Sequence, residues 1–355
     1  MKNILNLLIV FFIMVGCASK HKPVLQNEDS ISPSNLVFSQ EQKLSSHPVK
    51  LNIILNDPMQ LVMADSLLLI RDYGERLVKV FDPVRERILT SICRKGRGPG
   101  EFTERMTITY NKNDNAINTY EEEVRIFTHF HVAQALNWAN DSVKKVNFDK
   151  SLMQQLVKCN DSLFIGVGLF EKRYALFKPD GKFLRVKYDY PDLPDNDLPF
   201  GLKSIAYQGN LVVNSTGNRF IAASLYCDNI EFFEIIGADI KKIKVYQSYL
   251  PDLDNKSNGN QKILHPKEGT KFGYLDISAQ GNHIYCLYSG KTIKESRGKG
   301  GPFHGSTIRV FDIDGNPVVS YSLDRDVFKF TVDSQEKTIY AIVHNPEPEI
   351  VKFRL

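Results

Sequence analysis

Two glycine-rich segments, residues 94–102 (RKGRGPGEF) and 297–304 (RGKGGPFH), share a composition that suits anion binding. Guanidinium groups bind carboxylates and phosphates through paired hydrogen bonds, and glycine lets a ligand approach the backbone closely. If both segments lie on one face of the fold, they form a cationic patch for carboxylated sugars or phosphate groups. The candidate ligand-binding residues of this patch are Arg94, Lys95, Arg97, Arg297, Lys299 and His304.

The alternative interpretation of residues 94–102 is structural. Glycine and Pro99 then shape a connection between two elements, Phe102 packs against them, and the charges are solvated. A nucleotide-binding loop is excluded, because Pro99 lacks a donor N–H and no amphipathic helix follows. Gly290-Lys291-Thr292 resembles the end of a P-loop, but Tyr285 stands where that motif needs glycine.

Other candidates for chemistry are weaker. His129 and His131 fall on one face of an expected strand, but no third metal ligand is near in sequence, which favours a surface pair. The chain has no GxSxG motif to place a nucleophilic serine. We predict no cofactor, no metal and no catalytic residue. The later cysteines lack metal-binding spacing and are expected to be free thiols, with one disulfide as the alternative: Cys93, Cys159, Cys227 and Cys286.

The N-terminal residues predict where the protein is located in the cell, and they are not expected to be part of its fold. Residues 4–15 (ILNLLIVFFIMV) are an apolar run too short to span a bilayer and typical of a signal peptide. Gly16-Cys17 follows it and resembles a bacterial lipobox, so we expect residues 1–16 to be removed and Cys17 to be lipidated. The alternative is an ordinary signal peptide with an incidental cysteine. Residues 17–34 are polar with two prolines and are expected to form a flexible tether.

The remaining chain, residues 35–355, carries six repeats of one pattern. A turn of Asp, Asn, Gly or Ser leads into an apolar strand, and a second strand often ending Phe-Asp follows about fifteen residues later. Successive repeats are 49, 47, 56, 64 and 55 residues apart. Such units predict an all-β, six-bladed β-propeller, with a β-sandwich pair as the alternative. The repeats begin at Asp65, Asp114, Asp161, Gly217, Gly281 and Glu336.

The last repeat contains only three strands. We therefore expect an N-terminal strand, residues 35–43, to complete the last blade and close the ring. Residues 132–140 predict a short helix. Residues 251–271 are expected to join the fourth and fifth blades, and residues 289–306 to lengthen a hairpin in the fifth; long loops of this kind often bind ligands.

A lipobox, a six-blade pattern and Gly96-Arg97-Gly98-Pro99-Gly100-Glu101-Phe102 resemble the TolB-like six-bladed propeller lipoproteins of Gram-negative envelopes. This resemblance covers nearly the whole mature chain and implies a cell-envelope propeller. No catalytic residue is carried over with it.

Two functions remain open. The first is a membrane-anchored binding module, for a glycan, a peptide or an envelope protein, placed at the outer membrane with the periplasmic face favoured. The second is a hydrolase or lactonase with a divalent metal in the channel, which needs a cage of carboxylates and amides. One acid among the expected channel residues makes a poor calcium cage: Gln60, Arg105, Gln154, Gln155, Tyr274, Asp276 and Lys329. The net charge of +4 does not call for a nucleic-acid partner.

Overall fold

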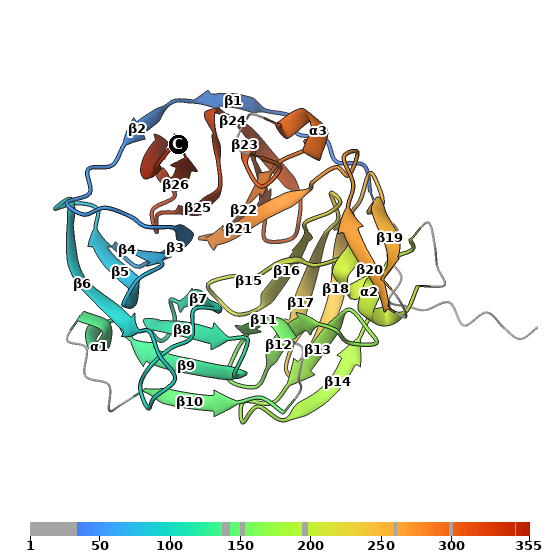
Figure 1. Cartoon of the computed structure of the whole chain (residues 1–355), viewed down its shortest axis with the longest axis horizontal. Helices are drawn as coiled ribbons and strands as arrows, with labels where there is room; N and C mark the ends of the chain where they lie inside the picture. The colour runs from blue at the N-terminus through green and yellow to red at the C-terminus, as the bar shows by residue number, and fades with distance from the viewer. Residues whose placement is uncertain are drawn as a thin grey trace, which may run out of the picture. The chain divides into compact units, whose positions relative to one another are not determined.

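The repeated turns join the first two strands of six sheets, which form a ring (Figure 1); five of these sheets have four strands, and the sheet of blade 5 has a fifth. The structure, a computed structural model, describes residues 34–136, 143–149, 153–193, 198–258, 261–297, 301–344 and 346–355. The prediction of an all-β, six-bladed propeller is confirmed. The signal peptide 1–16, Cys17, nearly all of the tether 17–34 and Lys299 lie outside the described residues.

Each blade has four strands, which we call A to D from the ring centre outwards. Blades 1 to 3 follow chain order: β3 (Pro58–Ala64), β4 (Leu67–Asp72), β5 (Arg76–Asp82) and β6 (Arg87–Arg94); β7 (Met106–Asn111), β8 (Ala116–Glu121), β9 (Ile126–His131) and β10 (Lys144–Asn147); β11 (Met153–Lys158), β12 (Phe164–Gly168), β13 (Tyr174–Phe177) and β14 (Phe183–Lys187).

Blades 4 to 6 continue around the ring. Their strands are β15 (Gly209–Val213), β16 (Arg219–Ser224), β17 (Ile230–Ile236) and β18 (Asp239–Tyr246); β21 (Tyr274–Gln280), β22 (His283–Tyr288), β23 (Gly305–Asp312) and β24 (Pro317–Val327); β25 (Lys329–Val332), β26 (Thr338–His344), β27 (Pro348–Arg354) and β2 (Ser46–Pro48).

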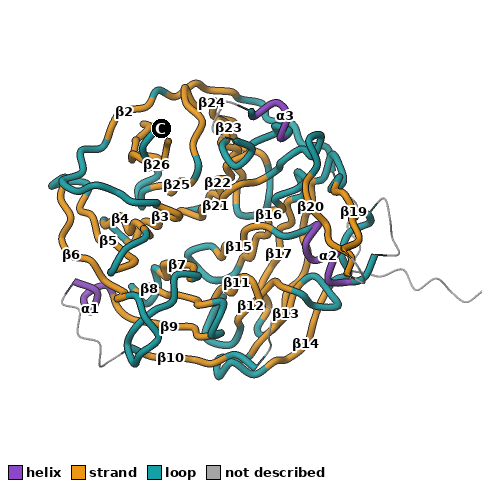
Figure 2. The backbone as a smooth tube through the Cα atoms, in the orientation of Figure 1, coloured by secondary structure: helices purple, strands orange, loops and turns teal. Residues whose placement is uncertain are grey.

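The two faces of the ring differ in their connections. Because the four strands of a blade are antiparallel, the A–B and C–D turns lie on one face, which we call the turn face. The B–C loops and the crossings from strand D to the next blade lie on the opposite face, which we call the crossing face. Strands dominate the ring and the helices lie at its periphery (Figure 2).

The A–B turns explain the repeated residue types. Five of the six contain a residue with positive φ, a conformation that Asn, Asp and Gly tolerate best. These residues are Asp65, Asn115, Gly217, Gly281 and Glu336. At Gly217, with φ of 70°, a Cβ atom would also lie 2.5 Å from the carbonyl oxygen of Cys159 in the neighbouring blade, so only glycine fits there.

The ring closes with an N-terminal strand, as predicted, but the residues differ. The strand that completes blade 6 is β2, which pairs antiparallel with β27. The expectation that residues 35–43 fill this place is wrong: β1 (Glu41–Leu44) instead pairs parallel with β24 of blade 5. Ser34 bridges to Tyr246 of blade 4. Residues 34–48, which we call the N-terminal strap, therefore run along the outer strands of three blades (Figure 1).

The insertions are where the sequence predicts them. Between blades 4 and 5, β19 (Leu253–Asn258) and β20 (Gln261–Pro266) form a hairpin. Between β22 and β23 lies α3 (Ile293–Ser296), and after β9 lies α1 (Val132–Leu136), whose predicted continuation to residue 140 is outside the described residues. In the described part of the chain, no helix has the length and apolar character needed to cross a bilayer.

Of the three short helices among the described residues, α3 and α2 (Phe200–Ala206) were not predicted. The proline-rich sequence just before α2 looks like a solvated connection, yet Leu193 and Leu198 are buried with Leu202 and Leu264. This apolar cluster joins the blade 3–4 crossing to the β19–β20 hairpin. The four cysteines 93, 159, 227 and 286 are free and buried, as expected.

Candidate functional site

A cavity of about 150 Å³ lies at the ring centre. Its lining continues into the A–B turns through Asp65, Asn113, Ser215 and Ser334, so the cavity reaches the turn face. Every blade contributes from its A strand, for example through Gln60, Ile108, Val157, Leu211, Asp276 and Thr331. The site therefore depends on a closed ring.

Polar side chains of the A strands bind the backbone of the next blade. Gln60 Nε2 donates to the carbonyl of Ile108 at 2.8 Å, and its Oε1 accepts from the amide of Ile108 at 2.9 Å. Gln155 Oε1 accepts from Leu211 N at 3.2 Å. Asn210 Nδ2 donates to the carbonyl of a neighbouring A-strand residue at 3.4 Å.

Gln60 and Gln155, together with Asp276, stand at a shift in strand register. The A–B pairing slips at Gln60, Gln155 and Asp276, in blades 1, 3 and 5. A bulge re-aims a side chain, and here it turns each polar group towards the adjacent blade. The sequence showed these residues at the inner edge but did not show that they join the blades.

Asp276 is the one acidic residue among the expected channel residues, so its contacts show whether a metal could bind there. Its Oδ2 accepts from Phe330 N at 3.0 Å, and Lys329 Nζ lies 3.9 Å from Oδ1. Burial raises the pKa of Asp276, an effect that Lys329 and backbone hydrogen bonds oppose. A carboxylate that is already occupied in this way, with amides bound to backbone, does not match the oxygen cage of calcium. No group of three or more metal-binding side chains occurs among the described residues.

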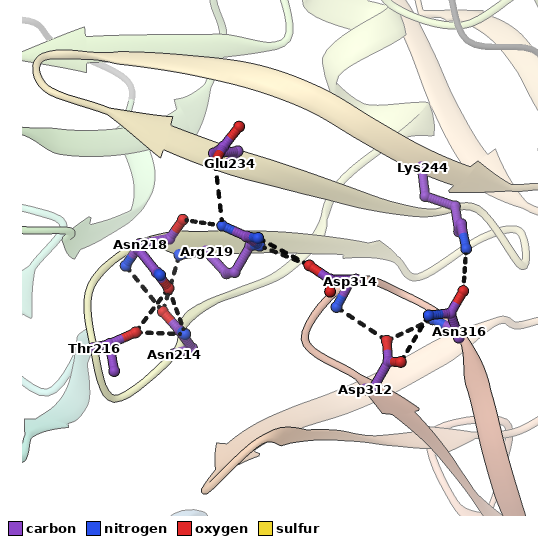
Figure 3. Close-up of polar contacts among 9 residues, drawn as sticks. All are labelled: Asn214, Thr216, Asn218, Arg219, Glu234, Lys244, Asp312, Asp314 and Asn316. Carbon is purple, nitrogen blue, oxygen red and sulfur yellow. Dashed lines mark hydrogen bonds and ion pairs between the residues drawn. The ribbon is translucent and has the colours of Figure 1, made fainter.

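The cavity rim is fixed by a hydrogen-bonded turn (Figure 3). Asn214 Oδ1 accepts from the amides of Asn218 at 3.1 Å and Arg219 at 2.9 Å. Arg219 Nη2 reaches Asp314 in the C–D turn of blade 5 at 2.9 Å, which ties blade 4 to blade 5 at the turn face. Asp312 Oδ1 accepts from the amides of Asp314 at 3.0 Å and Asn316 at 2.8 Å.

The first cationic segment is the crossing from blade 1 to blade 2. Phe102 is completely buried in the apolar cluster between these blades, as the structural interpretation predicts. Each cation lies near a glutamate: Arg94 is 3.8 Å from Glu101, Lys95 pairs with Glu104, and Arg97 is 3.8 Å from Glu123. The Arg97 side chain is 85% exposed.

The second cationic segment belongs to blade 5. Arg297 pairs with Glu268, and His304 Nε2 lies 3.0 Å from His344 Nδ1. A B–C loop carries this segment and a blade crossing carries the first, so both lie on the crossing face. Blade 6 stands between them in the ring. The two segments thus share a face without forming one contiguous patch.

The predicted histidine pair has other partners. His129 Nδ1 is 2.8 Å from Asn118 Oδ1, and His131 Nδ1 is 2.9 Å from the carbonyl of Asp114. Burial lowers the pKa of His129, which also lines a second cavity of about 290 Å³ between blades 2 and 3 together with Lys144 and Lys158.

A buried ionic network joins blades 3 and 4 on the crossing face, and sequence reasoning missed it. Arg173 Nε donates to Glu231 Oε2, which also accepts from Tyr174 at 2.7 Å. Lys242 lies 2.7 Å from Glu231 Oε1, and Arg173 Nη2 donates to Asn229 at 3.1 Å. Burial alone would raise the pKa of Glu231, but Arg173 and Lys242 lower it to about 2. Only the charged sequence of a strand, IEFFEI, hinted at it.

Two solved structures from Bacteroides species have the same fold. A protein of Bacteroides fragilis named "putative exported protein" has 11% identity and a TM-score of 0.52, over 88% of this chain and 98% of that chain. A member of the DUF4221 family from Bacteroides vulgatus has 9% identity and a TM-score of 0.56, over 88% and 96%. At these identities the likeness concerns the fold. No curated protein matches the chain.

A family model described as TolB-like 6-blade propeller-like matches residues 37–335, which span blade 1 to the A–B turn of blade 6. The match agrees with the six sheets of the ring. The chain therefore belongs to the TolB-like six-bladed propeller family.

Proposed function

We propose that this chain is an exported lipoprotein that acts as a binding module in a bacterial cell envelope. Its support is the apolar run that ends at Gly16-Cys17, together with the name of the Bacteroides fragilis protein that shares its fold. Lipid on Cys17 holds the chain at the outer membrane, on the periplasmic face. Sixteen residues separate Cys17 from Ser34, which allows the ring to sit up to about 55 Å from the membrane.

The ligand enters the central cavity from the turn face. The observation that carries this proposal is the cavity itself, because amide and hydroxyl side chains from several blades converge in it. Such groups suit a neutral ligand rich in hydrogen-bonding groups. A volume of about 150 Å³ is comparable to that of an engineered cavity that holds benzene. The cavity therefore takes one ring or side chain, and we assign it to the terminal sugar of a glycan.

Filling the cavity tests this assignment. Ser278 lines it, so Ser278→Leu in the full chain, purified in detergent, should abolish binding on a glycan array. Ser91→Leu, on the outer strand of blade 1, is the matched control and should bind as the wild type does. Binding that survives Ser278→Leu moves the ligand elsewhere. Binding on a peptide array alone identifies a peptide as the ligand.

A second candidate function is anion binding on the crossing face by Arg94, Lys95 and Arg97. Of the other predicted ligand residues, Arg297 and His304 belong to the separate segment in blade 5, and Lys299 lies outside the described residues. The exposure of Arg97 and its 3.8 Å distance from Glu123 favour this candidate, because an exposed ion pair contributes little and a ligand carboxylate can replace the glutamate. The Asp276 carboxylate already accepts a hydrogen bond from Phe330 N, which gives no support to the alternative of a hydrolase with a channel metal.

The membrane anchor has an independent test. Wild-type protein should take up labelled palmitate in cells and accumulate as a precursor when the lipoprotein signal peptidase is inhibited with globomycin. Cys17→Ala should do neither, while Cys93→Ala should behave as the wild type does. Label on Cys17→Ala would refute the anchor and leave the ligand assignment untouched.

A further inference from the structure

Two imidazoles from different blades converge on the crossing face. His304 precedes β23 of blade 5, and His344 is the last residue of β26 in blade 6. His304 Nε2 and His344 Nδ1 are 3.0 Å apart, and the ring planes meet at 79°. Phe328 packs against both rings, with centroid distances of 5.5 Å to each.

Nitrogen atoms this close share either a proton or a metal ion. Metal–imidazole bonds are about 2.0–2.1 Å long, so a separation of 3.0 Å subtends an angle of about 91–97° at a common ion. That angle is close to the right angle between adjacent ligands of a tetragonal ion and below the value of about 109° at a tetrahedral one. We propose that His304 and His344 form a binding site for Cu²⁺.

Both histidines stand on backbone that is already fixed. Ser289 Oγ lies 3.2 Å from the carbonyl of Pro302, which secures the loop just before His304. His344 pairs with Pro348 across the β26–β27 hairpin. Little conformational entropy is then lost when the ion binds, because the ligands are already in place.

Two charged residues near Phe328 in the sequence have partners of their own. Lys329 Nζ lies 5.7 Å from the centre of the Phe328 ring and donates to the carbonyl of Leu275 at 2.7 Å, towards the ring centre. Asp326 is bound to Lys291 at 2.6 Å. The donors that the pair itself offers are imidazole nitrogens, and these favour Cu²⁺ over Mg²⁺ or Ca²⁺.

The other histidine pair provides an internal contrast. The rings of His129 and His131 are 5.6 Å apart, and their Nδ1 atoms lie against Asn118 and Asp114 instead of each other. Only the His304–His344 pair brings two ring nitrogens together among the described ring contacts. Two histidines leave further coordination positions to water or to a ligand group. The pair lies on the crossing face, whereas the central cavity reaches the turn face, so this site is separate from the proposed sugar binding.

The experiment uses the full chain in detergent, without a histidine tag, titrated with Cu²⁺ in the absence of any glycan. Electron paramagnetic resonance should show one ion with two imidazole nitrogens. His304→Gln and His344→Asn each place an amide near the lost nitrogen and preserve a hydrogen bond between the loops. Each should lower the Cu²⁺ affinity at least about tenfold while the melting temperature without metal stays at the wild-type value.

His131→Asn is the matched control and should leave the Cu²⁺ affinity and the spectrum unchanged. Equal affinity in wild type and His344→Asn overturns the proposal, as does loss of the signal in His131→Asn. Tighter binding of Zn²⁺ than of Cu²⁺ overturns the tetragonal assignment. If His304→Gln does not fold, His344→Asn alone decides, because its side chain is exposed at the end of a strand.

Discussion

The two ionic contacts that flank blade 4 solve the same problem in different environments. On the crossing face, Arg173 and Glu231 join blades 3 and 4 with side chains 4% and 0% exposed. On the turn face, Arg219 and Asp314 join blades 4 and 5 with side chains 17% and 58% exposed. The first pair is removed from water and needs all its partners, whereas solvent screens the second. Both contacts between blades thus use an ion pair, but the fold depends more strongly on the buried one.

The largest expected effect is at the buried pair. Arg173→Met leaves Glu231 buried with Lys242 as its remaining cation, and loss of one partner of a buried pair costs about 3–5 kcal/mol of unfolding free energy. Arg219→Met, the matched change at the turn face, should cost less than about 1 kcal/mol. Urea unfolding of both variants measures the difference. Equal losses would break the comparison.

The unfolding free energy in acid should depend on the same ion pair. The pKa of Glu231 is about 2 in the folded protein and 4.5 in the unfolded chain. A lowered carboxyl pKa stabilises the fold above pH 4.5, and this contribution is lost as the pH falls from 4.5 towards 2. The loss amounts to about 3 kcal/mol. Glu231→Gln should be less stable at neutral pH and flatter over this range, whereas Arg219→Met should keep the wild-type slope in acid unfolding.

The inner edge of the ring should show an intermediate effect. Gln60→Ala removes both hydrogen bonds to Ile108 and leaves its backbone groups facing the cavity, at a cost of about 1–3 kcal/mol. Asn113→Ala, on the cavity rim, should change the stability by less than about 0.5 kcal/mol. Thermal unfolding compares the two. An equal loss of stability in Asn113→Ala and Gln60→Ala would show that the hydrogen bonds of Gln60 to the next blade add no particular stability.

The smallest stability effect belongs to the crossing from blade 1 to blade 2. Arg97→Ala should change the unfolding free energy by less than about 0.5 kcal/mol, because its side chain is largely exposed. If the crossing face binds anions, the same variant weakens binding of a carboxylated glycan, and Arg87→Ala at the start of β6, on the turn face, does not. An unchanged affinity, measured by calorimetry, would remove the anion-binding candidate.

The sequence predicted the turn face well and the crossing face poorly, for a physical reason. A–B turns need particular backbone angles, so Asp65, Gly217 and their counterparts reveal themselves by residue type. Phe102 was also predictable, since a lone aromatic at the end of a glycine-rich crossing has one nearby core to enter. Contacts such as Arg173–Glu231 join residues 58 positions apart and leave no periodic trace.

The closing strand shows the same limit. Three strands in the last repeat demanded a partner, and an N-terminal strand supplies it, but the register depended on the outer strand of blade 5 as well. Because Glu41–Leu44 pairs with β24, the strand that completes blade 6 is the next segment of the chain, Ser46–Pro48. The cavity was foreseeable as a channel. The inter-blade use of Gln60 and Gln155 was not, because a register shift decides where each side chain points.

The N-terminal strap has a consequence for biogenesis. Its residues are synthesised first, yet they pair with strands of blades 4, 5 and 6, which are synthesised last. Until then the strap has no edge to bind, and the edges of β24 and β27 stay open to other chains. The final step of folding thus joins the two ends of the polypeptide, and a late, long-range step of this kind is slow. A chain truncated before β27 would keep the strands that Ser34 and β1 contact but would leave β2 without its partner.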